Sequence, residues 1–202
     1  MTQELFIDYL NAPDVAALAL TDNEIIAAVE HGLDAQGRGT TVIEPRMHLI
    51  PGGGIDGHFN VLRGYVAPLS LAGVKVVGDF VDNYRRGLPS EMGLLNLFDP
   101  QTGQPVAIID AAGLTDMRTG AVTAIGAKHL ARRDSRVLAH IGARGTAYWN
   151  VRLLDSLFHF DEILFTDHQL PAGRASKTSC DNCWLWMPIS GICGTSWPWP
   201  RN

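Results

Sequence analysis

Hydrophobic residues repeat at helical spacing early in the chain. In the segment 22–36 the apolar positions that share one helical face are Ile25, Ile26, Val29 and Leu33. Just before them, Thr21 and Glu24 stand three residues apart, the spacing of a capping box in which each side chain binds the other residue's backbone N–H. The sequence therefore predicts a capped helix over 22–36.

From about residue 61 the pattern favours strands. The segments 61–70 and 73–80 are rich in valine and follow the glycine-rich stretch 51–60. The segments 94–98 and 105–111 flank Asp-Pro-Gln-Thr-Gly-Gln, whose residues suit a turn, so a β-hairpin is expected there. Because the strands follow one another directly, we expect an antiparallel or mixed sheet.

After Thr115 the period changes again. Thr115 is predicted to cap a helix over 117–132. A buried strand, a tight turn, a helix and a further strand follow at 135–142, 142–147, 148–158 and 160–166. A strand, a crossover helix and a second strand form a βαβ unit, which implies a parallel sheet.

The sequence changes in character near residue 164. All three cysteines lie beyond it, and residues 183–202 show neither helical nor strand periodicity. Cys180 and Cys183 have a spacing seen in zinc sites, but a second ligand pair is missing, so we expect no metal. We interpret 164–202 as an irregular tail, with an out-of-frame origin as the sharper hypothesis.

Composition excludes several classes of function. The 202 residues carry a formal charge of −5, which gives no reason to expect nucleic acid or an anionic membrane as a partner. No apolar run reaches the roughly 20 residues of a membrane helix, and the acidic N-terminus does not resemble a signal peptide. We therefore expect a cytoplasmic protein.

The turn at 142–147 has the context of a dinucleotide-binding loop. Gly142 and Ala147 fit the outer positions of the G-x-G-x-x-G/A pattern, Arg144 replaces the middle glycine, and Gly145 follows one step late. With Thr146, these residues would bring backbone N–H groups and a helix N-terminus to a pyrophosphate. An ordinary strand–helix turn is the alternative.

The segment 73–145 resembles the ornithine cyclodeaminase/μ-crystallin family, and the resemblance covers residues from about 20 to 163. The motifs that carry it are Gly73-Val74-Lys75, Gly87-Leu88-Pro89-Ser90, Phe98-Asp99-Pro100 and Leu114-Thr115 through Arg118-Thr119. The resemblance implies an α/β protein: an N-terminal α+β substrate and dimerisation domain, then the truncated start of a Rossmann domain. It further implies NAD or NADP as cofactor, a small amino- or imino-acid substrate and a homodimer.

Four polar residues match the family's substrate site. Arg46, Lys75 and Arg118 resemble its carboxylate-binding cations, and Ser90 its hydrogen-bonding hydroxyl. The ordinary interpretations are Lys75 as a solvated lysine, Arg118 as a surface arginine that pairs with Asp116, and Ser90 as the cap of a following helix. We expect Arg118 and Thr119 in the first turn of their helix, with Thr119 beside the cofactor. The helix dipole disfavours a cation in the first turn, so Arg118 there suggests that it shares an anion with the helix N-terminus.

The sequence also departs from the family. Asn60 falls near a glutamate that would hold the amine of the substrate side chain, and the family's catalytic aspartate finds no counterpart, so we expect little activity from this chain. The expected domains are 1–114, 115–163 and the tail 164–202. The leading functional hypothesis is ornithine cyclodeamination. The alternatives are a ketimine reductase or amino-acid dehydrogenase, and a non-catalytic binding protein of the μ-crystallin kind.

Overall fold

The computed structural model describes residues 4–142, 146–167 and 170–176. The chain divides into two compact units. The sheet unit comprises the described parts of 1–20 and 31–114, and the βαβ unit comprises 21–30 and the described residues from 115 onward. No helix among the described residues is long and apolar enough to cross a membrane.

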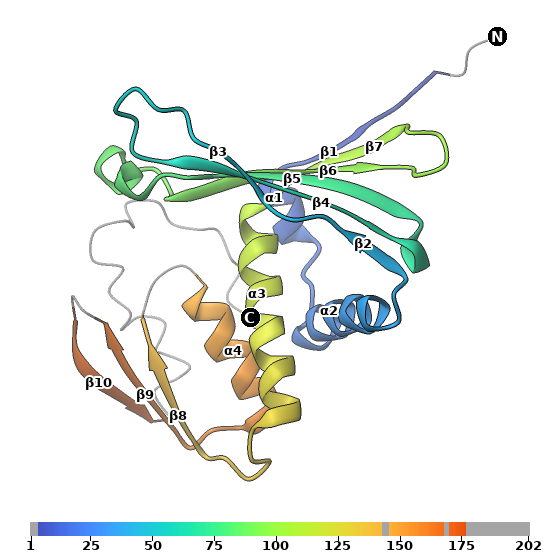
Figure 1. The fold of residues 1–202 in the computed structure, drawn as a ribbon. Helices are drawn as coiled ribbons and strands as arrows, with labels where there is room; N and C mark the ends of the chain where they lie inside the picture. The colour runs from blue at the N-terminus through green and yellow to red at the C-terminus, as the bar shows by residue number, and fades with distance from the viewer. Residues whose placement is uncertain (1–3, 143–145, 168–169, 177–202) are drawn as a thin grey trace. The chain divides into compact units, whose positions relative to one another are not determined.

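The sheet unit is built on one mixed sheet, as the strand pattern predicted. Its strand order is β1-β7-β6-β5-β4-β2, with β3 also paired to β4 (Figure 1). Only β1 and β7 run parallel, and the other neighbours are antiparallel. The strands are β1 (Asp8–Leu10), β2 (Thr41–Ile43), β3 (Met47–Leu49), β4 (His58–Val66), β5 (Leu71–Asp79), β6 (Glu91–Phe98) and β7 (Pro105–Asp110).

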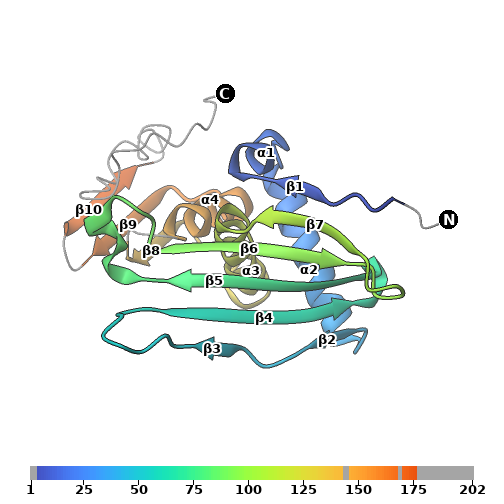
Figure 2. The same ribbon diagram turned by 90° about the horizontal axis from the view of Figure 1, so that it is seen from above.

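The hairpin β6–β7 confirms the prediction made from its turn residues. Asp99 Oδ1 accepts a hydrogen bond from the Gln101 backbone N–H at 2.7 Å, and this bond lowers the pKa of the Asp99 carboxyl. Gly103 takes a φ of 73°, which favours glycine. In Figure 2 the long strands β4 to β7 lie side by side in the order that the hydrogen-bond register gives.

The two faces of this sheet differ in burial. On one face a row crosses the sheet through Met47, Val61, Val76 and Leu94, of which Met47 and Leu94 are 56% and 44% exposed. The opposite face carries Lys75 and the buried Val77 and Ala107. We call these the open face and the Lys75 face. Short helices α1 (Ala12–Ala17), η1 (Ala67–Leu69) and η2 (Val81–Arg86) complete the unit, together with the C-terminal part of α2.

The βαβ unit contains the predicted parallel pair. Strands β8 and β9 are parallel neighbours. An irregular tail was expected from residue 164, but regular structure continues beyond it. Strand β9 runs to Asp167, and β10 pairs antiparallel with β9. Residues 177–202, including the three cysteines, lie outside the described residues. The elements are α3 (Ala112–Leu130), β8 (Val137–Ile141), α4 (Ala147–Phe158), β9 (Glu162–Asp167) and β10 (Leu170–Ser176).

Helix α3 starts earlier than the sequence predicted. Its first residue is Ala112, whose backbone N–H donates to Asp110 Oδ1 at 3.0 Å. Thr115 is therefore inside the helix rather than its cap, and the prediction of a start at Thr115 was wrong. Asp110 is the last residue of β7, so the residue that ends the strand also accepts the first N–H of the helix with its side chain.

The N-terminus of α2 (Asp22–Gly37) confirms the predicted capping box. Thr21 N donates to Glu24 Oε2 at 2.8 Å, and Glu24 N donates to Thr21 Oγ1 at 3.3 Å. The Thr21 hydroxyl also donates to Glu24, at 2.6 Å, and is the largest cause of the lowered pKa of that carboxyl. The predicted helix 22–36 is thus one residue shorter than the observed one.

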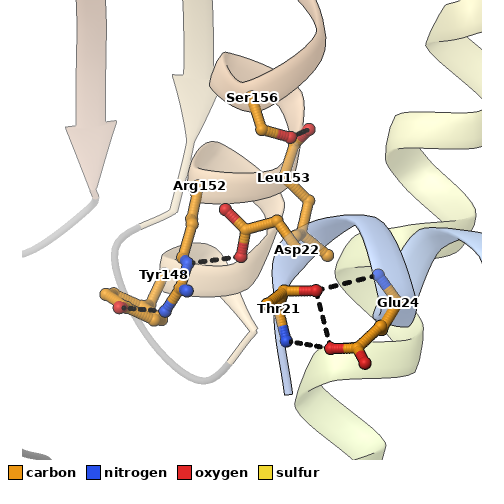
Figure 3. A network of polar contacts seen from close by, with 7 residues as sticks. All are labelled: Thr21, Asp22, Glu24, Tyr148, Arg152, Leu153 and Ser156. Carbon is orange, nitrogen blue, oxygen red and sulfur yellow. Dashed lines mark hydrogen bonds and ion pairs between the residues drawn. The ribbon is translucent and has the colours of Figure 1, made fainter. Parts of the chain in front are cut away.

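An ion pair joins the start of α2 to α4 within the βαβ unit. Asp22 Oδ1 lies 2.7 Å from Arg152 Nε, with both side chains about one third exposed or less (Figure 3). Arg152 Nη1 also donates to the Tyr148 hydroxyl at 3.0 Å, and its guanidinium lies 4.8 Å from the Trp149 ring centroid. The planar guanidinium thus makes three contacts that a lysine could not reproduce together.

Helix α3 packs closely on α4 because its inner face is small. Gly120, Ala121 and Ala124 are buried at helical spacing, between the larger buried residues Met117 and Ile125. A Cβ on Gly120 would stand 2.6 Å from the backbone carbonyl of Trp149, which is rigid. Contact at this point therefore requires the absence of a side chain.

We predict that Gly120→Ala destabilises the protein by about 1–3 kcal/mol, because α4 must move away from α3. The matched control is Gly126→Ala in the same helix, where a Cβ meets nothing within 4 Å. Removing a glycine from an open helical position should stabilise by up to about 1 kcal/mol. Urea unfolding measures both, and equal effects of the two substitutions would contradict this account of the packing.

Candidate active site

Lys75 occupies the middle of β5 in the sheet unit. Its neighbours across the strands are Leu62 on β4 and Leu95 on β6. Val74 and Val76 point to the open face, as the alternation of a strand requires. Lys75 is half-buried and shares its face with the buried Val77, which is an unusual environment for a lysine.

Arg46 and Ser90 belong to connections of the same unit. Arg46 is exposed and lies between β2 and β3. Ser90 immediately precedes β6, and its carbonyl accepts the Phe80 backbone N–H at 2.8 Å. A strand rather than a helix follows Ser90, so the interpretation of this serine as a helix cap was wrong.

Arg118 and Thr119 lie in the second turn of α3, not the first, because the helix begins at Ala112. The helix dipole acts mainly within the first turn, so it disfavours a cation at Arg118 only weakly. The Thr119 hydroxyl donates to the Thr115 carbonyl at 2.7 Å, so its proton is used within the helix. Its oxygen keeps the ability to accept.

The strand–turn–helix at 142–147 has backbone features of a phosphate-binding turn. Gly142 follows β8 with a φ of 95°, and a Cβ placed on it would meet nothing within 4 Å. Thr146 is the N-cap of α4, and Ala147, its first residue, is 3% exposed. His140 Nδ1 lies 2.8 Å from the Gly142 carbonyl and holds the end of the strand against the turn. Arg144 and Gly145 lie outside the described residues.

The predicted substrate residues thus fall into two groups. Arg46, Lys75 and Ser90 belong to the sheet unit. Arg118, Thr119 and the described turn residues belong to the βαβ unit. Asp167 is the last residue of β9. In dinucleotide-binding folds the end of the second parallel strand carries the acid that binds the ribose.

One feature of the Lys75 face was not predicted. A pocket of about 440 Å³ opens where β3, β4 and β5 meet the glycine-rich loop. It is lined by His48, Ile50, Ile55, Asp56, Gly57, His58, Asp79 and Val81. The sequence gave no direct signal for it, because His48, His58 and Asp79 come together only through the pairing of β3, β4 and β5.

Comparison with known proteins places the chain in a family. The sequence pattern of the ornithine cyclodeaminase/mu-crystallin family matches residues 8–183. The chain belongs to this family, and the match begins before residue 20 and ends after residue 163, the limits of the resemblance seen in the sequence. Members of the family carry a mixed α/β fold whose second part is of the Rossmann type.

Two curated relatives have different activities. The chain is 32% identical over 174 residues to an alanine dehydrogenase of Archaeoglobus fulgidus, covering 86% of this chain and 52% of the relative. It is 33% identical over 169 residues to an L-lysine cyclodeaminase of Streptomyces rapamycinicus, covering 83% of this chain and 48% of the relative. The chain thus spans about half the length of these relatives.

Two solved structures share the fold. An archaeal alanine dehydrogenase dimer with bound NAD superposes with a TM-score of 0.74 at 31% identity, covering 80% of this chain and 48% of that one. The Thermococcus litoralis Δ1-pyrroline-2-carboxylate reductase, solved with NADH and L-proline, gives 0.76 at 28% identity, covering 80% and 50%. Solved members of the family therefore contain a nicotinamide cofactor.

Proposed function

We propose that this chain supplies part of an NAD(P)-dependent enzyme that acts on the C–N bond of a small α-amino acid. Conversion of ornithine to proline and ammonia is the type reaction. Residues 1–114 form the substrate and dimerisation domain, and 115–163 open the cofactor domain. The observation that carries the proposal is a half-buried lysine in the middle of β5, in a chain that also has an open glycine turn before a helix.

The turn fits the pyrophosphate of NAD or NADP. Space is free around the Gly142 Cα, so the backbone there can approach a ligand closely. The N–H groups of the first turn of α4 lack partners within the helix and favour an anion. Thr146 and Ala147, with Arg144 and Gly145, complete the proposed cradle, and Thr119 is proposed to lie beside the cofactor. The nicotinamide, when bound, supplies hydride chemistry at the α-carbon.

The substrate carboxylate is assigned to the cations. Lys75 is half-buried, and in an environment partly withdrawn from water a charge-assisted hydrogen bond is stronger than at the surface. Arg46 and Arg118 are proposed to join it, because a guanidinium can bind both carboxylate oxygens at once. Ser90 adds a neutral donor. Together these groups would fix the α-carbon in place for the reaction.

Imine reduction or amino-acid oxidation is the second candidate. Asn60 favours it, because an amide binds the second ammonium of ornithine less well than a glutamate does. The two curated relatives act as a dehydrogenase and as a cyclodeaminase, so the family supports both reactions. The third candidate is a ligand-binding protein of the μ-crystallin kind that does not turn over a substrate.

A homodimer is proposed through the open face of the sheet. The archaeal alanine dehydrogenase is a dimer. In this chain Met47, Leu49, Met92 and Leu94 project from that face and are 41–60% exposed. A contiguous apolar surface of this kind marks an interface.

The proposed function is tested by binding and turnover together. NADH fluorescence and calorimetry with L-ornithine should show that the purified protein binds both. Ammonia and NADH are then followed in one reaction: ammonia without net change in NADH indicates cyclodeamination, and a net change indicates redox chemistry. Binding of both ligands with no product fits the μ-crystallin-like function, and it also fits the little activity expected of a chain without the family's catalytic aspartate. Failure to bind both NADH and NADPH would contradict the proposal in all its forms.

We expect Gly142→Ala to weaken NADH binding at least about tenfold. A φ of 95° disfavours any side chain, and the new Cβ would occupy the space left for the pyrophosphate. Gly103→Ala is the control, because Gly103 has a similar φ of 73° but lies in the β6–β7 turn of the other unit. It should lose stability and bind NADH as before; equal NADH affinity in both variants would remove Gly142 from the site.

Leu94→Glu should convert the dimer to a monomer in sedimentation analysis. A carboxylate in the middle of an apolar interface loses its hydration without gaining a partner. Leu130→Glu is the control, since Leu130 is 88% exposed at the end of α3 and is not part of the sheet. If Leu94→Glu sediments like the unsubstituted protein, the open face is not the interface.

A further inference from the structure

Asn150 lies one helical turn after Thr146, the N-cap of α4. Residues four apart on a helix share a face, and Asn150 Nδ2 donates a hydrogen bond to Thr146 Oγ1 at 3.3 Å. The Asn150 backbone N–H also donates to the Thr146 carbonyl, at 3.0 Å. The backbone and the side chain of Asn150 are therefore both bonded to the residue that joins the proposed phosphate turn to α4.

The Thr146 hydroxyl does not cap the helix in the usual way. An N-cap threonine normally has an extended backbone and accepts a hydrogen bond from a backbone N–H of the first turn. Thr146 instead lies in the right-handed helical region, with φ −70° and ψ −4°, and its side chain makes no capping bond. The N–H groups at the start of α4 are thus not occupied by this hydroxyl, as an anion-binding helix N-terminus requires.

The bond from Asn150 determines what the Thr146 hydroxyl can do. A threonine hydroxyl has one proton to donate and two lone pairs with which to accept. Because Asn150 Nδ2 donates to one lone pair, the O–H bond points away from the amide and its proton is not used in this contact. A phosphate oxygen at the N-terminus of α4 could accept that proton beside the backbone N–H groups.

Asn150 contributes little to the stability of the helix. Among the residues that the structure describes, none donates a hydrogen bond to its buried Oδ1 atom. A buried acceptor without a donor is costly, and asparagine is less favourable than alanine inside a helix. Residues that serve binding are often retained at a cost in stability, so these observations favour a role in binding over a role in packing.

We infer that Asn150 is a positioning residue for the cofactor, whose amide orients the Thr146 hydroxyl to donate to a pyrophosphate oxygen of NAD or NADP. The inference rests on the proposed function, which places the pyrophosphate at this turn. It deepens that function, because it makes the Thr146 side chain a donor in addition to the backbone. Asn150 acts through Thr146 and need not contact the cofactor itself.

A double-mutant cycle tests this inference. The dissociation constant is measured by fluorescence for whichever of NADH and NADPH the unsubstituted protein binds more tightly. Thr146→Val removes the hydroxyl and should weaken binding at least about tenfold, as expected for a hydrogen bond to a charged group. Asn150→Ala should weaken binding about threefold to tenfold in the unsubstituted protein. In the Thr146→Val background it should change binding less than about twofold, because the hydroxyl that it orients is absent.

Thermal unfolding without cofactor separates positioning from a structural role. Asn150→Ala should unfold at the same temperature as the unsubstituted protein or higher, because alanine favours the helix and the buried acceptor is removed. Ser156→Ala is the matched control. Ser156 is half-buried on the same helix, and its hydroxyl donates to the Leu153 carbonyl at 2.8 Å (Figure 3). This variant should bind the cofactor as the unsubstituted protein does.

Equal cofactor affinity of Asn150→Ala and the unsubstituted protein would overturn the role of Asn150 and leave the proposed function intact. Equal losses from Asn150→Ala in both backgrounds would also overturn it, because Asn150 would then not act through Thr146. A lower unfolding temperature of Asn150→Ala together with weaker binding would assign Asn150 a structural role instead. An unsubstituted protein that binds neither NADH nor NADPH would overturn the proposed function and this inference with it.

Discussion

The register between β4 and β5 is the constraint on which the candidate site depends. Leu62 stands opposite Lys75, and His58 stands opposite Asp79. Because strand side chains alternate, a shift of one residue would exchange the two faces and expose the lysine on the apolar side. The long pairing of β5 with both β4 and β6 holds this register. The same alternation creates the apolar open face, so the surroundings of Lys75 and the proposed interface arise from one sheet.

Close packing has the corresponding role in the βαβ unit. The small residues of α3 allow the backbone of α4 to approach at Trp149, and the Asp22–Arg152 ion pair fixes α4 to the start of α2. Helix α4 begins at the proposed phosphate turn, so its position decides where its N-terminal N–H groups point. The glycine at 120 and the turn at 142 are distant in sequence, yet both serve the placement of one helix.

Local patterns in the sequence predicted the elements that depend on local physics. The capping box at Thr21, the β6–β7 hairpin and the parallel β8–β9 pair all follow from residues close together in the chain. The start of α3 did not follow, because Thr115 offers a typical cap while the observed start depends on Asp110 at the end of a strand. Strand β10 was missed because Pro171 and Gly173 weaken its pattern.

The pocket could not be predicted because pairing between strands assembles it. His48, His58 and Asp79 are separated by 10 and 21 residues, and only the β3–β4–β5 register brings them to one face. Register thus decides which side chains share a face of the sheet, whatever their distance along the chain.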